Sequence, residues 1–202
     1  MKLVIATRNN DKIREISDRF KSIPEIELLS LKDYDNSPDI VEDGATFFEN
    51  ALKKARLITA FTGQASLADD SGLEIDALGG EPGIYSARYA GDNATDTERN
   101  MLVLDKMKDI PEEKRGAKFI SVIAVTFPDK TEYTTYGECK GIISFQMIGH
   151  EGFGYDPIFY LPDFGKTMAQ LSLSEKNSIS HRAKALEQIE IRLKKILKNN
   201  SS

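Results

Sequence analysis

The stretch that decides the fold is Lys118–Phe127, with the sequence KFISVIAVTF. Its apolar residues fall on both alternating sets of positions, as in a strand that is covered on both faces of a sheet. Pro128–Lys130 then predicts a turn, and Thr131–Phe145 predicts a long returning strand. The two strands and their turn predict a hairpin inside a sheet.

Short strands and helices alternate on the N-terminal side of this hairpin. We expect strands at 2–6 and 26–31 and helices at 11–21, 46–62 and 95–108 there, and a final helix at 180–198 after the hairpin. Two of these helices begin with a capping box, in which a Thr and a Glu three residues later bond each other's backbone amides. The side chains expected to face inward on the second helix are Phe48, Ala51, Leu52, Ala55 and Ile58. Alternation followed by a long hairpin predicts an α/β fold with a mixed sheet.

Composition limits the classes of protein that the chain can represent. Its 202 residues suit a single domain over 1–202, with a polar tail at 199–202. Lys and Arg number 27 against 32 Asp and Glu, a net charge of −5 that disfavours nucleic-acid polymers and membrane surfaces as partners. One cysteine excludes an intramolecular disulfide framework. No apolar run is long enough for a signal peptide or a membrane span, so we expect a cytoplasmic protein.

The first polar cluster joins the first strand to the first helix and runs from Thr7 to Lys12, TRNNDK. A helix N-terminus holds phosphate groups well, because its unpaired amides carry partial positive charge. Thr7 and Asn9 would add hydrogen bonds and Lys12 a full charge. The alternative is an ordinary turn in which Asn caps the helix and Lys12 is solvated.

The second cluster is the carboxylate pair Asp69 and Asp70, placed after a short apolar run and before Ser71 and Gly72. Two carboxylates at a strand end can bind Mg²⁺, and one of them can act as a base toward water. Glu42 could bring a third carboxylate. The alternative is a surface turn, since Asp is poor in strands and common in turns.

Two further clusters lie in the C-terminal third of the chain. Gly149–Pro157, GHEGFGYDP, predicts a loop whose aromatic rings either stack on a nucleotide base or are buried as anchors. Lys176–Arg182, KNSISHR, places cations at the start of the last expected helix, where the helix dipole disfavours them. This second placement favours a function over a solvated turn.

Together these clusters resemble the inosine triphosphatase family. The matching segments occur in family order over about residues 1–185: T-x-N-x-x-K at 7–12, EDGATFFENA at 42–51, ADDSGL at 68–73, GGEPGIYSARYAG at 79–91, GFGYDPIF at 152–159 and KNSISHR at 176–182. The resemblance implies an elongated mixed sheet flanked by helices, in two lobes with an active-site cleft. It implies a homodimer and Mg²⁺-dependent hydrolysis of ITP, dITP and XTP to the monophosphate and pyrophosphate, which cleanses the nucleotide pool.

The resemblance also implies a role for each matching residue. Asp70 would be the catalytic base, and Mg²⁺ would be held by Glu42, Asp69 and Asp70. The substrate would be bound by Thr7, Arg8, Asn9, Asn10, Asp11, Lys12, Ser71, Phe153, Gly154, Tyr155, Asp156, Lys176, His181 and Arg182. The alternatives are a pyrophosphatase with another base specificity and a nucleotide-binding module without activity.

Overall fold

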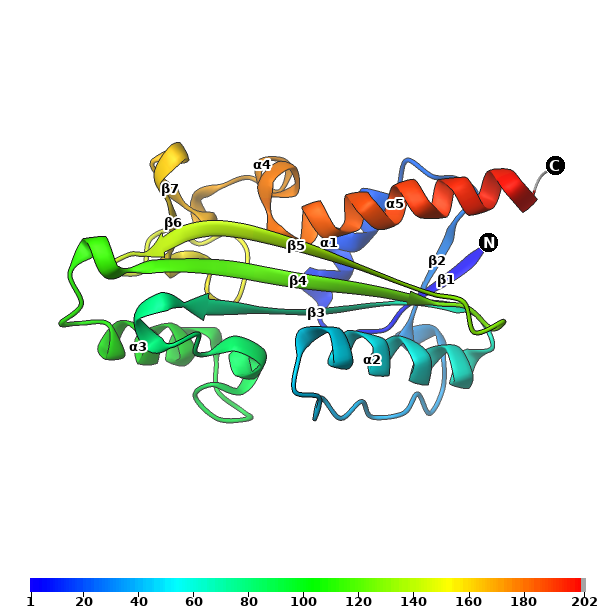
Figure 1. The fold of residues 1–202 in the computed structure, drawn as a ribbon, viewed down its shortest axis with the longest axis horizontal. Helices are drawn as coiled ribbons and strands as arrows, with labels where there is room; N and C mark the ends of the chain where they lie inside the picture. Colours follow the sequence, from blue (N-terminus) through cyan, green and yellow to red (C-terminus); the bar gives the residue numbers. More distant parts are fainter. Residues whose placement is uncertain (201–202) are drawn as a thin grey trace. The chain divides into compact units, whose positions relative to one another are not determined.

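The computed structural model describes residues 1–200, so the end of the expected polar tail lies outside the described residues (Figure 1). Its α-helices are α1 (Asn10–Phe20), α2 (Phe47–Thr62), α3 (Asp96–Lys106), α4 (Leu173–Ile179) and α5 (His181–Asn200). Its strands are β1 (Lys2–Ile5), β2 (Glu27–Ser30), β3 (Ala65–Ile75), β4 (Gly116–Thr126), β5 (Glu132–Ile143), β6 (Phe159–Leu161) and β7 (Lys166–Thr167). Within residues 1–200, no helix combines the length and apolarity needed to cross a bilayer.

Short 3-10 helices connect several of these elements. They are η1 (Leu31–Asp33), η2 (Asp76–Leu78), η3 (Gly83–Arg88), η4 (Glu112–Lys114), η5 (Asp156–Ile158), η6 (Pro162–Phe164) and η7 (Met168–Gln170). Of these, η3 and η5 carry residues of the loop network described below.

The strands form one seven-stranded sheet in the order β2-β1-β3-β4-β5-β6-β7. β1 pairs in parallel with β2 and with β3, whereas β6 pairs antiparallel with both β5 and β7. The mixed sheet expected from the sequence is therefore confirmed. The central position of β4 agrees with its burial, since residues 119–126 are all buried.

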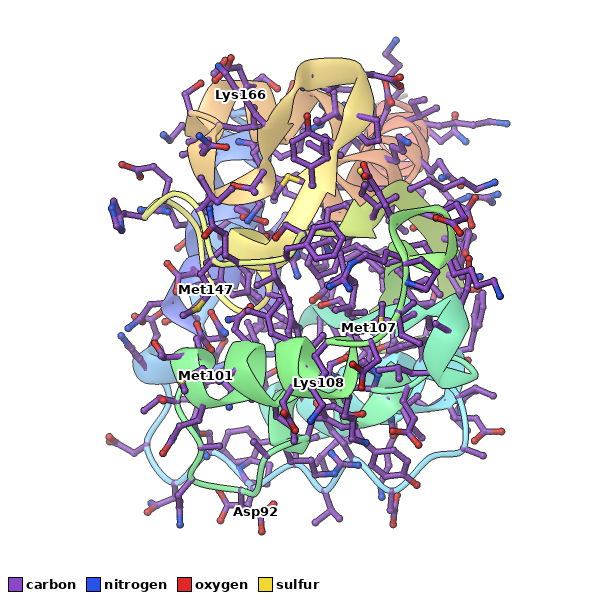
Figure 2. All side chains as sticks on the ribbon, turned by 90° about the vertical axis from the view of Figure 1, so that its left-hand side faces the viewer. Asp92, Met101, Met107, Lys108, Met147 and Lys166 are labelled. Atoms are coloured by element: carbon purple, nitrogen blue, oxygen red, sulfur yellow. The ribbon has the colours of Figure 1, made fainter. Side chains whose placement is uncertain are left out.

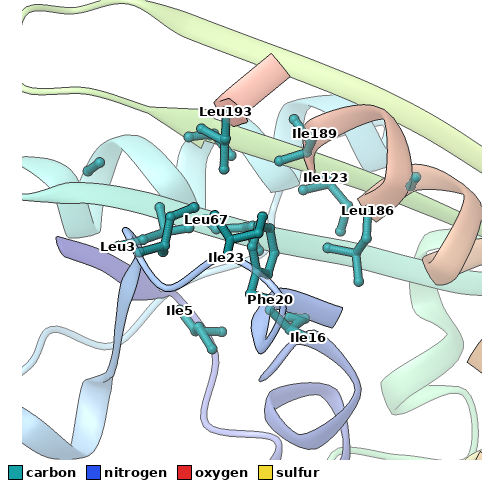
Figure 3. Close-up of a cluster of buried hydrophobic side chains, with 14 residues drawn as sticks. Leu3, Ile5, Ile16, Phe20, Ile23, Leu67, Ile123, Leu186, Ile189 and Leu193 are labelled. Atoms are coloured by element: carbon teal, nitrogen blue, oxygen red, sulfur yellow. The ribbon is translucent and has the colours of Figure 1, made fainter. Parts of the chain in front are cut away.

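The chain divides into two compact units, and β3, β4 and β5 each contribute residues to both. The first unit comprises Met1–Asp70, Ser121–Gly137 and Arg182–Ser202, and the second comprises Ser71–Ile120 and Glu138–His181. Each unit has a hydrophobic core of its own. The side chains of the first core come from α1, β1, β3, β4, α5 and the segment after α1 (Figure 3).

The core of the second unit gathers Leu73 and Ile75 of β3 with residues of α3, β4, β5 and the segment after 150. Helix α3 shows how the sequence produces this packing. Val103 and Met107, four positions apart, are fully buried, whereas Met101 is exposed (Figure 2). Residues four apart share one face of a helix, so this spacing directs one side of α3 into the core.

Three expectations about local structure were wrong. Phe48 does not face inward: it is exposed and stacks on Tyr136, while the buried face of α2 begins one position earlier, at Phe47. The apolar strand does not stop before Asp69, because β3 continues through both carboxylates to Ile75. Lys176 does not begin the last helix but lies in the separate helix α4, which ends before His181 starts α5.

Candidate active site

Asp69 is the centre of a buried charge cluster in the first unit. Its Oδ1 accepts a hydrogen bond of 2.6 Å from Ser121 Oγ, and its Oδ2 lies 2.6 Å from Lys12 Nζ and 3.2 Å from Arg182 Nη2. Arg182 is itself buried, and its Nη1 donates to Glu15 Oε2 at 2.5 Å. Two carboxylates therefore share one guanidinium, and the fork of the guanidinium matches this arrangement.

The charges around Asp69 determine its protonation. Burial by itself raises the pKa of Asp69, but attraction to Arg182 and Lys12 and the hydrogen bonds outweigh it, so the pKa lies well below its usual range. Burial and the nearby charges of Lys54 and Arg182 lower the pKa of Lys12, and Asp69 opposes them, so that pKa lies below its usual value. Asp69 is thus held as a carboxylate, with both of its oxygens engaged.

Asp70 has a different set of partners, although it is the next residue in β3. Lys54 Nζ of α2 donates to Asp70 Oδ1 at 2.7 Å and to Glu42 Oε1 at 2.5 Å. Burial raises the pKa of Asp70, and Lys54 offsets this only in part, so the pKa lies above its usual value. Burial lowers the pKa of Lys54, but Asp70 and Glu42 outweigh it and the pKa is raised. A carboxylate with a raised pKa suits a general base.

The carboxylates offer a partial fit to a metal ion. Within residues 1–200, no group of three or more His, Cys, Asp or Glu side chains lies close enough to hold a metal. The expected set of Glu42, Asp69 and Asp70 is therefore not brought together, because the oxygens of Asp69 face Ser121, Lys12 and Arg182. Glu42 and Asp70 do converge on one positive charge, the Lys54 ammonium. Two carboxylates with added water are a donor set that Mg²⁺ accepts.

The segment before α1 was expected to bind phosphate. Asn9 is the N-cap of α1, and its Oδ1 accepts hydrogen bonds from the amides of Asp11 at 2.9 Å and Lys12 at 3.0 Å. Thr7 Oγ1 accepts from the amide of Asn9 at 3.2 Å. The capping alternative is thus confirmed for Asn9. The solvated alternative is wrong for Lys12, whose ammonium is held by Asp69.

The remaining residues of this segment point to other partners. Arg8 donates to Asp39 Oδ1 at 2.7 Å and to Ser37 Oγ at 3.1 Å. Asn10 Oδ1 accepts from Lys32 Nζ at 2.9 Å. These contacts attach the segment to residues 32–39. Substrate binding by Arg8, Asn10 and Asp11 stays a prediction.

The second unit contains the glycine-rich loop, which is organised around the buried carboxylate of Asp156. Asp156 Oδ2 accepts from the amide of Phe153 at 2.9 Å and from Lys176 Nζ at 2.6 Å. The same ammonium lies 4.6 Å from the centre of the Phe153 ring, within the range of a cation–π contact. Gly152 has φ +76° and would bring a Cβ within 2.1 Å of Asp156 Oδ2, so this turn requires glycine.

Tyr155 anchors the other side of this loop. Its ring is buried, and its hydroxyl donates to the carbonyl of Ser86 in η3 at 2.8 Å. Burial raises the pKa of Tyr155 above its usual value. The alternative of a loop pinned by a buried aromatic ring is therefore confirmed for Tyr155, whereas Phe153 is only half-buried.

His181 and Arg182 are neighbours in sequence with different surroundings. His181 is buried and stacks on Phe119, with ring centroids 4.8 Å apart and planes inclined by 16°. Arg182 belongs to the Asp69 cluster of the first unit. Ser71 follows Asp70 in β3 and is half-buried.

Sequence reasoning missed three residues around Asp69 and Asp70. Lys54, Glu15 and Ser121 are buried and bind the two aspartates directly or through Arg182. Lys54 and Glu15 lie on buried helix faces where an apolar side chain is usual, and a charge on such a face was a signal that could have found them. Ser121 had only the weak signal of a polar residue within an apolar strand.

Comparisons with known proteins give the relatives of this chain. A dITP/XTP pyrophosphatase from Geobacter sulfurreducens is 49% identical over 185 residues, which cover 92% of each chain. The enzyme of that name from Desulforamulus reducens is 45% identical over 187 residues, 93% of this chain and 92% of its own.

Solved structures give the same result for the fold. A Ham1 protein from Coxiella burnetii superposes with a TM-score of 0.88 at 42% identity, over 96% of this chain and 99% of its own. The Ham1 protein of Staphylococcus aureus gives a TM-score of 0.87 at 40% identity, over 96% and 98%. The family model described as the Ham1 family matches residues 3–191. The resemblance seen in the sequence is thus confirmed, and the chain belongs to the Ham1 family.

Proposed function

We propose that this protein hydrolyses dITP, XTP and ITP to the nucleoside monophosphate and pyrophosphate, and so removes non-standard purines from the nucleotide pool. The observation that carries the proposal is Asp70, a buried carboxylate with a raised pKa that lies among lysines. The names of the relatives that cover nine tenths of the chain support the same reaction.

The proposed reaction is attack by water on the α-phosphorus. A new P–O bond forms to the water oxygen, the bond from the α-phosphorus to the bridging oxygen breaks, and pyrophosphate leaves with that oxygen. Asp70 accepts the proton of the attacking water. Lys12 and Lys54 place positive charge beside the phosphates, and charge neutralisation is the larger part of such catalysis.

We propose that Glu42 and Asp70 hold Mg²⁺ in the presence of substrate. When bound, Mg²⁺ would supply further positive charge at the phosphates and make water more acidic. The support is the convergence of Glu42 and Asp70 on one ammonium group. In this proposal Asp69 acts through other groups, because it holds Lys12 and Arg182 in place.

The glycine-rich loop is the proposed base-binding element. The half-buried ring of Phe153 offers a face for stacking, worth about 1–3 kcal/mol per base. Hypoxanthine and xanthine carry an acceptor oxygen at position 6, where adenine carries a donor amino group. His181 and Lys176 are the proposed donors near the base. Adenine would leave a donor unsatisfied, at a cost of about 1–3 kcal/mol.

The remaining proposals concern the setting of the enzyme. We propose that the chain acts as a homodimer in the cytoplasm, where the nucleotide pool is replenished. Both follow from the family resemblance.

Pyrophosphate release by the purified full chain tests the proposed function. The substrates are dITP, XTP, ITP, GTP, ATP, CTP and UTP, each with MgCl₂ and with EDTA. We expect release from the first three to exceed release from ATP, CTP and UTP by at least about tenfold, and to require Mg²⁺. Release of orthophosphate alone, or a preference for CTP or UTP, would contradict the proposal.

A further inference from the structure

The N-terminus of α3 carries a carboxylate outside its capping box, that of Asp96. Thr95 and Glu98 complete the capping box, since Thr95 Oγ1 accepts from the amide of Glu98 at 3.2 Å and Glu98 Oε2 accepts from the amide of Thr95 at 2.7 Å. Asp96, between them, takes no part in this exchange. Its side chain is directed to a different segment of the second unit.

Asp96 and Asn100 hold both polar groups of one residue in the glycine-rich loop. The amide of Gly154 donates to Asp96 Oδ2 at 2.6 Å, and Asn100 Nδ2 donates to the carbonyl of Gly154 at 2.7 Å. Asn100 is 1% exposed, and the same Nδ2 also donates to the carbonyl of Asp96 at 2.7 Å. The partners lie more than 50 positions apart in the chain, so the contact is tertiary.

The pair is itself held in place. Arg99 bonds the other carboxylate oxygen of Asp96 and donates to the carbonyls of Ala94 and Ala87. A hydrogen bond between a carboxylate and an amide is stronger than one between neutral groups. Helix α3 packs into the second core through Val103 and through Met107, which follows the helix directly. Asp96 and Asn100 therefore lie on an element fixed by the core.

Gly154 is the position in the loop where these hydrogen bonds matter most. It has φ +62°, a conformation that lets the chain turn between Phe153 and Tyr155. On one side of Gly154, Asp156 binds the amide of Phe153; on the other, the Tyr155 hydroxyl binds Ser86. The peptide groups on either side of Gly154 are attached to α3 by Asp96 and Asn100.

We propose that Asp96 and Asn100 are positioning residues for the base-binding loop. By holding Gly154, they keep Phe153 and Asp156 where a purine base is recognised, and so they determine substrate affinity and the choice of base. The inference rests on the proposed function, which assigns the base to this loop. Neither side chain needs to touch the substrate.

Two near-isosteric variants test the pair, and a third serves as their control. Asn100→Asp replaces a donor that faces two carbonyl oxygens by an acceptor. Asp96→Asn weakens the bond to the Gly154 amide at a position whose side chain is 45% exposed, so the fold should tolerate it. Asp105→Asn makes the same chemical change on the same helix, at a side chain 71% exposed that contacts Lys108.

The measurements are KM and kcat for dITP, XTP, ATP and GTP, and the ¹H–¹⁵N resonance of the Gly154 amide. For Asn100→Asp we expect KM for dITP and XTP to rise at least about tenfold, with kcat changed less than about threefold, because the loop is assigned to binding of the base and not to the reacting phosphate. The preference for dITP and XTP over ATP and GTP falls as KM rises. Asp96→Asn gives the same pattern more weakly and moves the Gly154 amide upfield, while Asp105→Asn matches the wild type.

Two results would overturn the proposal: a shifted Gly154 resonance with unchanged KM and base preference, or equal effects from Asp105→Asn. If Asn100→Asp does not fold, Asp96→Asn decides the question. If the wild type releases no pyrophosphate from any substrate, the proposed function fails. In that case, an unchanged Gly154 resonance in Asp96→Asn would separately overturn the positioning role.

Discussion

Asp69 and Asp70 are adjacent residues of one strand, yet their hydrogen-bond partners differ and their pKa values shift in opposite directions. Asp69 faces two cations and a hydroxyl, and its pKa lies well below the usual range. Asp70 shares one ammonium with Glu42, and its pKa lies above the usual value. Successive side chains of a strand point to opposite faces, so a step of one residue moves a carboxylate from one environment to the other.

The comparison teaches that one carboxylate stabilises the fold while its neighbour is available for chemistry. For a carboxyl group, a depressed pKa means that folding favours the charged form, and a raised pKa means that folding disfavours it. Folding therefore favours the charge of Asp69 and disfavours the charge of Asp70. Three substitutions can break or sharpen this contrast.

The largest expected effect is on turnover in Asp70→Asn. We expect kcat for dITP to fall at least about 10⁴-fold, which is about 5.5 kcal/mol of barrier, because an amide cannot take the proton of water. The unfolding free energy should stay within about 1 kcal/mol of the wild type or rise, since the raised pKa marks a carboxylate that burial disfavours. Steady-state kinetics and urea denaturation measure the two quantities. Turnover within tenfold of the wild type would remove Asp70 from the role of base.

Asp69→Asn should instead act on stability. The change leaves Arg182 and Lys12 buried without the Asp69 charge, and we expect a loss of about 3–5 kcal/mol in unfolding free energy. Urea denaturation of the metal-free protein at pH 7 measures it. Asp70→Asn is the matched control, because it is the same change one residue away.

The pH dependence of stability checks the cause of this loss. A depressed folded pKa contributes stability at pH values above the unfolded pKa of about 3.9, and the contribution disappears as the pH falls toward the folded value. The wild type should therefore lose stability below about pH 5 more steeply than Asp69→Asn does. If the unfolding free energies of the two proteins fall in parallel with pH, the stability does not come from the charge of Asp69.

The smallest expected effect belongs to Lys12→Ala. Loss of one charge-assisted phosphate contact should raise KM for dITP about tenfold, while Asp69 keeps Arg182 and Ser121 and stability changes little. Lys21→Ala, directly after α1, removes an exposed lysine that pairs with Asp18 and is the control. An unchanged KM in Lys12→Ala would assign Lys12 to the Asp69 cluster alone.

Much of the fold was accessible from the sequence because the signals are local. The alternation of strands and helices, the capping boxes and the apolar run of β4 predicted the mixed sheet, and the boundaries of α2 and β5 agree within one or two residues. The error at Phe48 arose because two buried polar residues, Asn50 and Lys54, occupy the inward face of α2. Apolar periodicity does not register polar side chains that are buried with partners.

The site was accessible only as a set of residue types. The sequence indicated Asp69 and Asp70 as a pair around a metal ion, with Asp70 also as the base. Their separation into two regions depends on Lys54, Ser121 and Arg182, which no local pattern connects to them. The strand through Asp69 and Asp70 was missed for the same reason, since tertiary partners override the poor strand propensity of Asp.

By itself, the sequence of this protein determined the order of its elements, the motifs of the Ham1 family and an acidic charge balance, all of which depend on residue types and short spacings. Tertiary structure alone decided which charges meet. Glu15 and Arg182 form an ion pair although 167 positions separate them. The physical reason is that a buried charge takes its pKa and its role from groups within a few ångströms, and those groups are assembled by packing rather than by position in the chain.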